Sequence, residues 1–387
     1  MYGLSLFGHR RKSTVVLIDV GSASISGAYA CVEKDCHPTI YYSTHVPISL
    51  RDDLSPEDAV AQALIKITKD LLTIGAPIVS RYTNKEIHMD RIIISIAAPW
   101  QDVRIQTRQK TEKKPFRFTK TVMDDMVMKI FAKTAHGRII TNSMVVSIML
   151  NGYVVTKPFG IKTKEAKMVV LGSYITKEIA NCVTDIVTGA FHTDNIEITA
   201  FAPIAYSVLC SLYPDEKNML IIDITGEMTD VVLIKNGLLV DITHTKRGLN
   251  VLRRSARDAG MRTTNSSESF HAIEHAVLID KDHNAQFTAR IQQARALWLQ
   301  DIAHILQTLN ARYVLPKVIF ILVDEDAVLF IKRQFDEEPI FKKIWLSSDP
   351  LSVIPLDAKR FSSLVTYKKE SHDDPFLSIL ALYAIRQ

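Results

Sequence analysis

Short apolar segments separated by turn residues fill most of the first hundred positions, which is the pattern of β-strands. One helix interrupts them, because Ser55-Pro-Glu-Asp58 combines an N-cap serine with proline and acids in the first turn. Apolar residues then recur at helical spacing, which gives this helix one buried stripe. The four strands that we expect around it span 14–20, 26–33, 39–48 and 91–98.

The same order of elements returns loosely from residue 219. A duplication of strand-rich lobes explains this repeat better than a Rossmann fold, whose strands alternate with helices from the start. In this second half we expect two strands on either side of a turn within 220–234, further strands at 196–201, 238–243 and 317–323, and helices at 202–212, 248–259, 266–278, 285–310, 326–335 and 375–386.

Residues 102–190 carry a pattern of their own between the two halves. The basic, polar stretch 104–117 predicts an exposed link, and a helix follows over 119–135. Asn151-Gly152 is a strong hairpin signal between strands at 144–150 and 153–157. A third strand at 165–171 and a helix at 176–190 complete what we expect to be a compact inserted α/β subdomain.

Length and composition exclude several classes of protein. At 387 residues the chain is long enough for two domains, and 47 basic against 42 acidic residues leave a balance too even to indicate nucleic-acid binding. Four cysteines provide no disulfide framework, which is typical of a reducing cytosol. No apolar run approaches the roughly 20 residues that span a bilayer.

The first twelve residues combine apolar and basic side chains. This arrangement has two interpretations: a segment that enters the membrane interface beside anionic lipids, or a leader that frays before the first strand. The residues that would contact the membrane are Leu4, Leu6, Phe7, Arg10, Arg11 and Lys12.

Two short stretches almost 200 residues apart have the form of phosphate-binding turns. Each runs from an apolar strand into a turn with an aspartate and a glycine, and then into another strand. Glycine lets backbone N–H groups approach phosphate oxygens, and Asp19 is placed to hold a hydrated Mg²⁺. The candidate nucleotide-binding residues are Asp19, Gly21 and Ser22 in the first turn, and Asp223, Gly226 and Thr229 in the second.

With these two turns, the helix before the second turn and the insertion, the chain resembles the FtsA/PilM family of actin-like proteins, and FtsA-like division proteins more closely. The resemblance implies an α/β fold of two lobes, each RNase H-like, with an inserted subdomain of the SHS2 type. It also implies ATP and Mg²⁺ as cofactors, and a membrane-associated scaffold as the function. The implied partners are a tubulin-like division protein such as FtsZ, a pilus protein peptide, further copies of the chain in a filament, or a membrane surface.

Two of the family's three nucleotide elements differ in this sequence. In the second turn, Thr225 and Glu227 stand where the family has glycine, and Met228 where it has threonine. Glu227 would place a carboxylate beside the phosphates. Two like charges about 4 Å apart repel by roughly 4 kcal/mol near a protein surface. The adenosine turn has Asp324-Glu-Asp326 in place of a glycine pair. We therefore expect little or no hydrolysis, and no catalytic residue is predicted.

The predicted role is a cytoplasmic scaffold of cell division, peripheral on the inner face of the membrane. A PilM-like scaffold of type IV pilus assembly is the first alternative, and an active ATPase or phosphotransferase is the second. The predicted segments are a leader (1–13), the first lobe (14–101), the insertion (102–190), the second lobe with a helical part (191–374) and a C-terminal helix (375–387) that packs back on the first lobe.

Overall fold

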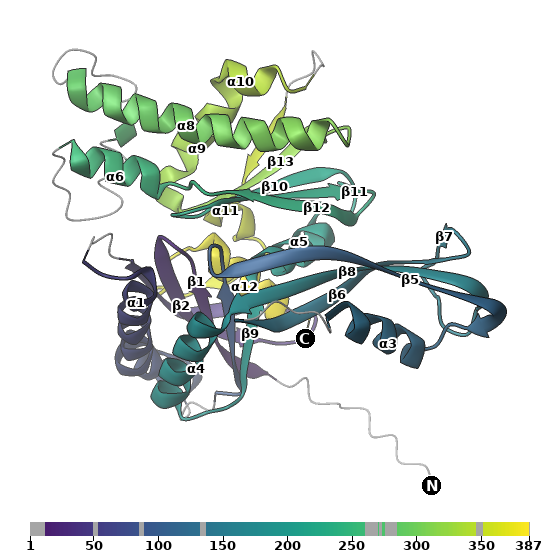
Figure 1. The fold of residues 1–387 in the computed structure, drawn as a ribbon. Coiled ribbons are helices and arrows are strands. Elements are labelled where there is room, and N and C mark those ends of the chain that lie inside the picture. Colours follow the sequence, from purple (N-terminus) through teal and green to yellow (C-terminus); the bar gives the residue numbers. More distant parts are fainter. Residues whose placement is uncertain are drawn as a thin grey trace, which may run out of the picture.

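The computed structural model describes residues 12–48, 53–84, 89–131, 137–259, 270, 273–274, 285–345 and 351–386. Within these residues the chain forms three β-sheets, of which two belong to stacked lobes and one projects to the side (Figure 1). No helix in these ranges is long and apolar enough to cross a membrane. Of the predicted membrane segment, Leu4, Leu6, Phe7, Arg10 and Arg11 lie outside the described residues.

The first sheet has the strand order β15-β3-β2-β1-β4-β9. Its central strand β1 is antiparallel to β2 and parallel to β4, and helices cover both faces, which explains the continuous apolar runs. The serine-proline start at Ser55 is confirmed, because its side chain accepts a hydrogen bond from the backbone N–H of Asp58. The elements are β1 (Ser13–Val20), β2 (Ser24–Val32), β3 (Thr39–Pro47), β4 (Arg91–Ile96), β9 (Ile196–Ala200), β15 (Thr366–Tyr367), α1 (Pro56–Asp70), a π-helical turn (Leu71–Gly75), α2 (Ala76–Thr83), α4 (Lys177–Phe191), α5 (Phe201–Leu212) and α12 (Pro375–Ala384).

The second sheet repeats the topology of the first, with the order β12-β11-β10-β13-β14. Strand β10 is antiparallel to β11 and parallel to β13, as β1 is to β2 and β4. The predicted duplication of lobes is thereby confirmed. The elements are β10 (Met219–Ile224), β11 (Thr229–Lys235), β12 (Leu238–Thr245), β13 (Val318–Val323), β14 (Ser352–Pro355), α6 (Asn250–Asp258), α8 (Ala285–Asn310), a 3-10 turn (Glu325–Ala327), α9 (Val328–Glu337), α10 (Pro339–Lys342) and α11 (Ala358–Phe361).

One apolar cluster joins the two lobes. It contains residues of α5 and α12 together with one face of each lobe sheet, such as Leu17 of β1 and Ile221 of β10. A second cluster lies in the first lobe among β1, α1 and α4, and a third in the second lobe under α8. The lobes are therefore packed on shared helices, which hold the carboxyl ends of β1 and β10 near each other.

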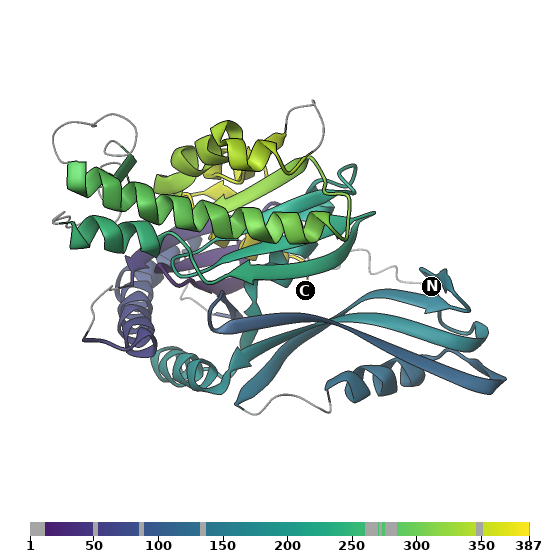
Figure 2. The same cartoon turned by 45° about the horizontal axis from the view of Figure 1, so that its top comes forward.

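The insertion is a four-stranded sheet with one helix on one face, and it extends away from the lobes (Figure 2). The prediction of a link at 104–117 was wrong, because these residues belong to a 17-residue strand paired with β8. Their polarity reflects a strand whose side chains are largely exposed beyond the lobes, and it is therefore no sign of a loop. The elements are β5 (Gln101–Arg117), α3 (Lys120–Phe131), β6 (Arg138–Leu150), β7 (Tyr153–Val154) and β8 (Lys162–Thr176).

Several elements lie in a different part of the fold from the one that the chain order suggests. Strands β9 and β15, which fall within 191–374, pair in the first sheet. Helix α4, which begins within 102–190, packs on α1 in the first lobe. The C-terminal helix α12 packs on β1 and β2. The borders of the predicted segments stay a prediction.

Candidate functional site

The structure brings the two predicted phosphate turns together at the boundary between the lobes. Gly21 closes the first turn by donating its backbone N–H to the carbonyl of Ser24, at 3.0 Å. The second turn is closed by the N–H of Thr225, which donates to the carbonyl of Met228 at 3.0 Å. Both turns follow the inner strand of their sheet, so the duplicated topology places them face to face.

The turns contact each other directly. The Ser22 hydroxyl donates to Oγ1 of Thr225 at 2.9 Å and accepts from the backbone N–H of Glu227 at 2.9 Å. A Cβ at Gly226 would lie 2.9 Å from backbone atoms of both Ser22 and Ala23. The Ser22 hydroxyl and the backbone N–H of Glu227, which could otherwise donate to a phosphate, therefore form hydrogen bonds between the lobes.

Helix α6 neutralises the glutamate that departs from the family pattern. Arg254 forms a two-pronged ion pair with Glu227, in which Nη1 lies 3.0 Å from Oε2 and Nη2 contacts Oε1. Asn250 donates its side-chain amide to the same carboxylate at 2.8 Å, and its backbone N–H to the carbonyl of Gly226 at 2.7 Å. The Glu227 carboxylate therefore binds α6, so the predicted repulsion of phosphates is not its role in this arrangement.

The turn that replaces the adenosine element is also held by α6. Nη2 of Arg253 lies 3.4 Å from Oδ2 of Asp324 and 3.8 Å from Oδ2 of Asp326, and the guanidinium lies 5.3 Å from the ring centroid of Phe270. These contacts are internal to the second lobe. Sequence reasoning missed α6 as part of the site, although its pattern Asn250-Val-Leu-Arg-Arg254 places three hydrogen-bonding side chains in the first two turns of a helix.

Aspartates with raised pKa values lie behind the turns. Burial raises the pKa of Asp19 to about 7, although its carboxylate accepts a hydrogen bond from Ser95. Burial also raises the pKa of Asp230 to about 7, and the amide of Gln101 donates to it at 3.2 Å. The pKa of Asp223 is raised well above its ordinary value by burial and then by neighbouring carboxylates. Among the residues that the structure describes, neither of its oxygens has a hydrogen-bond partner.

Thr229 has a different place from the one predicted. Its side chain is buried inside the second lobe, where the hydroxyl donates to the carbonyl of Arg247 at 3.0 Å and accepts from the indole N–H of Trp298 at 3.2 Å. The Thr229 side chain therefore links the start of β11 to α8 through the hydrogen bond from Trp298. It does not face the first turn.

The residues as arranged do not fit a nucleotide between the turns. Carboxylate oxygens are suitable Mg²⁺ ligands, yet no group of three or more histidine, cysteine or acidic side chains in the described ranges is placed to hold a metal ion. The turns are in backbone contact at Gly226, so a phosphate would require the lobes to separate. ATP and Mg²⁺ stay predictions for this chain.

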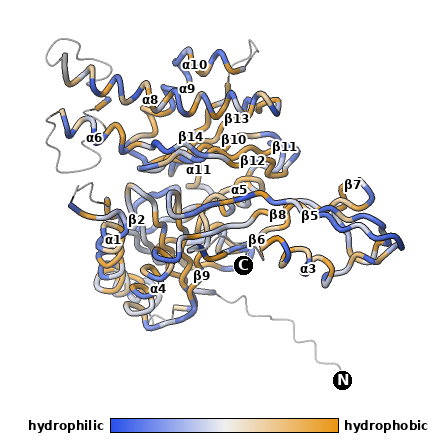
Figure 3. Tube along the Cα trace, viewed as in Figure 1, coloured by the Kyte–Doolittle hydropathy of each residue, from blue (hydrophilic) through white to orange (hydrophobic). Residues whose placement is uncertain are grey.

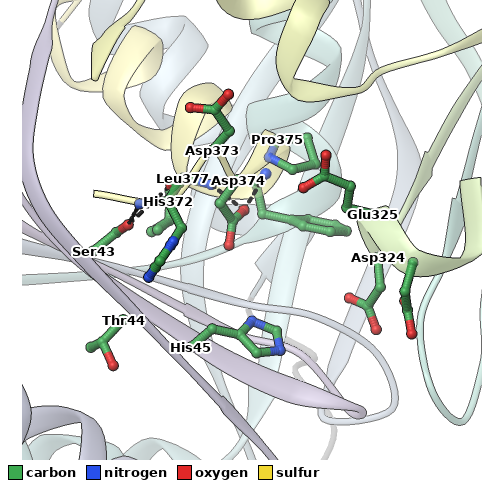
Figure 4. A pocket seen from close by; sticks show the side chains of 12 residues that line it. Ser43, Thr44, His45, Asp324, Glu325, His372, Asp373, Asp374, Pro375 and Leu377 are labelled. Atoms are coloured by element: carbon green, nitrogen blue, oxygen red, sulfur yellow. Dashed lines mark hydrogen bonds between the residues drawn. The ribbon is translucent and has the colours of Figure 1, made fainter. Parts of the chain in front are cut away.

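A cavity of about 200 Å³ opens between the lobes, and its walls include residues of β3, of the turn after β13 and of the segment that begins α12 (Figure 4). Asp374 caps α12, because it accepts from the backbone N–H groups of Phe376 and Leu377 and from the Ser26 hydroxyl, at 2.8, 3.1 and 2.6 Å. Five carboxylates line the cavity, so its charge favours a cationic group. The lining residues are Ser43, Thr44, His45, Asp324, Glu325, Asp326, His372, Asp373, Asp374, Pro375, Phe376 and Leu377.

Sequence reasoning missed this cavity because its walls come from three distant segments. They are the end of β3, the turn after β13 and the loop before α12. Only the capping pattern Asp374-Pro375 was a local signal, and it predicts a helix start more readily than a site.

The duplicated sheets, joined through α5 and α12 and opposed at two aspartate turns, define an actin-like ATPase fold. Among solved structures, a chain of a PilM–PilN type IV pilus biogenesis complex superposes with a TM-score of 0.64 at 11% identity, over 97% of this chain and 98% of that chain. A protein with an actin-like ATPase fold and unknown function from Bacteroides thetaiotaomicron matches with a TM-score of 0.39 at 8% identity, over 99% of both chains.

The ethanolamine utilization protein EutJ from Carboxydothermus hydrogenoformans matches with a TM-score of 0.41 at 13% identity, over 96% of this chain and 88% of that chain. No protein-family model matches the sequence, and no curated protein matches it. At 11% identity, the likeness to the chain of the PilM–PilN complex establishes the fold alone. The predicted division role, with FtsZ as its partner, stays a prediction.

Proposed function

We propose that this chain is a scaffold of the PilM kind, which binds a short peptide of a pilus-assembly protein and does so without nucleotide turnover. The observation that carries the proposal is the closed contact between the turns. Ser22 of the first turn contacts Thr225 and Gly226 of the second turn across the lobe boundary. Helix α6 forms ion pairs with Glu227 and with the acidic turn after β13. A protein that stabilises its closed form with its own side chains has no need of a nucleotide to hold the lobes together.

The pilus role is preferred to the division role on overall shape. The superposition with the chain from the PilM–PilN complex extends over nearly the whole of both molecules. It includes the region of the insertion, which we assign to the SHS2 type on its resemblance in sequence. The partner in this proposal is a peptide of a PilN-like protein from the same organism, and the protein works at the inner face of the cell membrane.

Calorimetric titration tests the nucleotide part of the proposal. With Mg²⁺ present we expect no ATP binding up to millimolar concentration, because the turns are in backbone contact and the α6 side chains are engaged. Ser22→Ala, which removes the two hydrogen bonds of the Ser22 hydroxyl to the second turn, serves as the comparison variant. Micromolar binding of ATP by the wild-type protein would contradict the proposal and revive the ATPase alternative.

Fluorescence anisotropy with labelled peptides tests the partner. We expect the cytoplasmic segment of the PilN-like protein to bind with the same Kd in the presence and absence of ATP, and a scrambled peptide not to bind. If the C-terminal tail of the organism's FtsZ binds and the PilN-like segment does not, the division role replaces the pilus role.

A further inference from the structure

The far end of the insertion sheet gathers exposed apolar side chains. The fractional exposures are 78% for Tyr153, 60% for Val154, 55% for Phe159 and 39% for Ile161, and all four lie within nine residues of chain. Phe159 stacks on the buried ring of Phe118 at 6.2 Å between centroids, so a packed base holds it in position. Single exposed apolar residues are ordinary, but four together on one projection indicate a contact surface.

The same end carries a concentrated positive charge. We call residues 110–117 and 153–167 the insertion tip. It holds eight basic and two acidic residues, an excess larger than the net charge of +5 for the whole chain. Of the two acids, Glu112 pairs with Lys110 and Glu165 accepts a hydrogen bond from Gln109. In the described part of the chain, no ion pair is formed by the exposed side chains of Lys113, Lys114, Arg117, Lys157, Lys162, Lys164 and Lys167.

Strand register places apolar and basic groups on one open face. Val154 is opposite Met149, which is opposite Lys167 on the next strand, and cross-strand partners lie on the same face of a sheet. The other face is occupied by α3, whose Met126 packs with Ala166 and Met168. The open face therefore presents Val154 and Lys167 on either side of Met149, and no helix of the described insertion residues lies over them. Tyr153 is opposite the buried Leu150 and so lies on the α3 side of the same end of the sheet.

The tip projects from the molecule and does not line the cavity between the lobes. Figure 1 and Figure 2 show the ends of β5 and β8 and the short strand β7 as the outermost part of the sheet, and Figure 3 shows the far ends of β5 and β8 as largely hydrophilic. The turns at Gly152 and Gly160 both have positive φ, and a Cβ added at either glycine would meet no atom within 4 Å, so both turns are open to the outside.

We propose that the insertion tip binds an anionic lipid bilayer, with Tyr153, Val154 and Phe159 entering the headgroup region and the lysines contacting lipid phosphates. Projecting aromatic and aliphatic side chains flanked by lysines are suited to this interface, because lysine extends its apolar stem while its ammonium group stays among headgroups. An acidic protein partner is the competing occupant. It is less favoured because the apolar groups project outward on a two-residue strand and a turn, which offer little edge for a paired peptide.

Co-sedimentation of the full chain with vesicles tests the proposal. We expect binding to phosphatidylcholine vesicles containing about 25% phosphatidylglycerol, at least tenfold weaker binding to phosphatidylcholine alone, and weakening by high salt. The fourfold variant Lys113→Glu/Lys114→Glu/Lys162→Glu/Lys164→Glu should lose at least tenfold in binding, and Tyr153→Ser/Phe159→Ser several-fold.

Matched controls come from the second lobe and from the N-terminal segment. Lys342→Glu/Lys343→Glu and Val314→Ser/Leu329→Ser change equally exposed residues far from the tip and should bind as the wild type does. The Arg10→Glu/Arg11→Glu/Lys12→Glu variant separates the predicted membrane segment from the tip. Thermal melting of each variant is the control for folding, and we expect a cooperative transition in every case.

Three outcomes would overturn the proposal. The first is failure of the wild-type chain to bind anionic vesicles. The second is wild-type binding by the fourfold tip variant, with loss only in the Arg10/Arg11/Lys12 variant, which would assign the anchor to the N-terminal segment. The third is binding of a polyglutamate peptide at the tip without vesicle binding, which would assign the tip to an acidic protein. None of these bears on peptide or ATP binding, so the proposed function is tested separately.

Discussion

Asp223→Asn should raise the free energy of unfolding by about 2 kcal/mol at pH 8, although it alters a buried residue at the centre of the site. Neither oxygen of Asp223 has a hydrogen-bond partner in the described part of the chain, and its pKa is raised by burial and by Asp230, Asp19 and Asp324. At pH 8 the unfolded carboxyl is ionised, so folding must take up a proton or bury an unpaired charge. Asparagine removes that requirement, because its side chain is neutral at every pH.

The pH dependence of stability follows from the same group of acids. The pKa values of Asp19 and Asp230 are raised to about 7 in the folded protein, from ordinary values near 4. The folded state thus binds more protons than the unfolded state between these limits. The stabilisation from these two groups is fully present below about pH 4 and is lost as the pH rises through about 7.

Urea unfolding at pH 5, 6, 7 and 8 measures both effects. We expect the wild-type free energy of unfolding to fall across this range, and the fall to be smaller in Asp223→Asn. The control is Asp215→Asn, because Asp215 is exposed in the turn before β10 and should change the stability by less than about 0.5 kcal/mol at every pH. A lower stability of Asp223→Asn at pH 8 would contradict the description of Asp223 as an unpaired buried acid.

The parts of the fold that the sequence predicted are those with local causes. Strand β1 is continuously apolar from Val15 to Ile18 because helices cover both faces of its sheet. Helix α1 begins directly after its N-cap Ser55, because the capping signal is encoded within four residues. Strand β5 was missed because its exposed distal half has no core side to impose an apolar alternation. Long antiparallel pairing with β8 determines its structure, and that pairing is not visible in its own residues.

The candidate site divides in the same way. The positions of Asp19 and Asp223 near the ends of β1 and β10 follow from strand–turn–strand patterns, and the structure brings the two strand ends together at the lobe boundary. The hydrogen bonds of Ser22 to the second turn span more than 200 residues of chain, and the placement of Arg253 and Arg254 depends on where α6 docks. Such contacts arise from tertiary packing, so no motif in one segment could indicate them.

Gly248→Ala should destabilise the protein by about 3 kcal/mol, the upper end of the usual cost of overpacking. A Cβ at this position would overlap the carbonyl oxygen of Thr225 and would lie 2.6 and 2.7 Å from the carbonyl oxygen and carbon of Gly226. All three atoms are backbone, so no side-chain rotation relieves the overlap. The glycine lets α6 approach the second turn so closely that the N–H of Asn250 reaches the carbonyl of Gly226.

The matched control for this prediction is Gly189→Ala in α4, where a Cβ would meet no atom within 4 Å. Alanine there should raise the stability by roughly 0.5–1 kcal/mol, because glycine loses more backbone entropy in a helix. Thermal melting and urea unfolding measure both changes. Because the Gly248 overlap lies between α6 and the second turn, its variant should also loosen the ion pair of Arg254 with Glu227 and increase hydrogen exchange at the α6 amides. A Gly248→Ala protein as stable as the wild type would mean that α6 does not dock tightly on the turn, and the basis for a nucleotide-independent closed form would be lost.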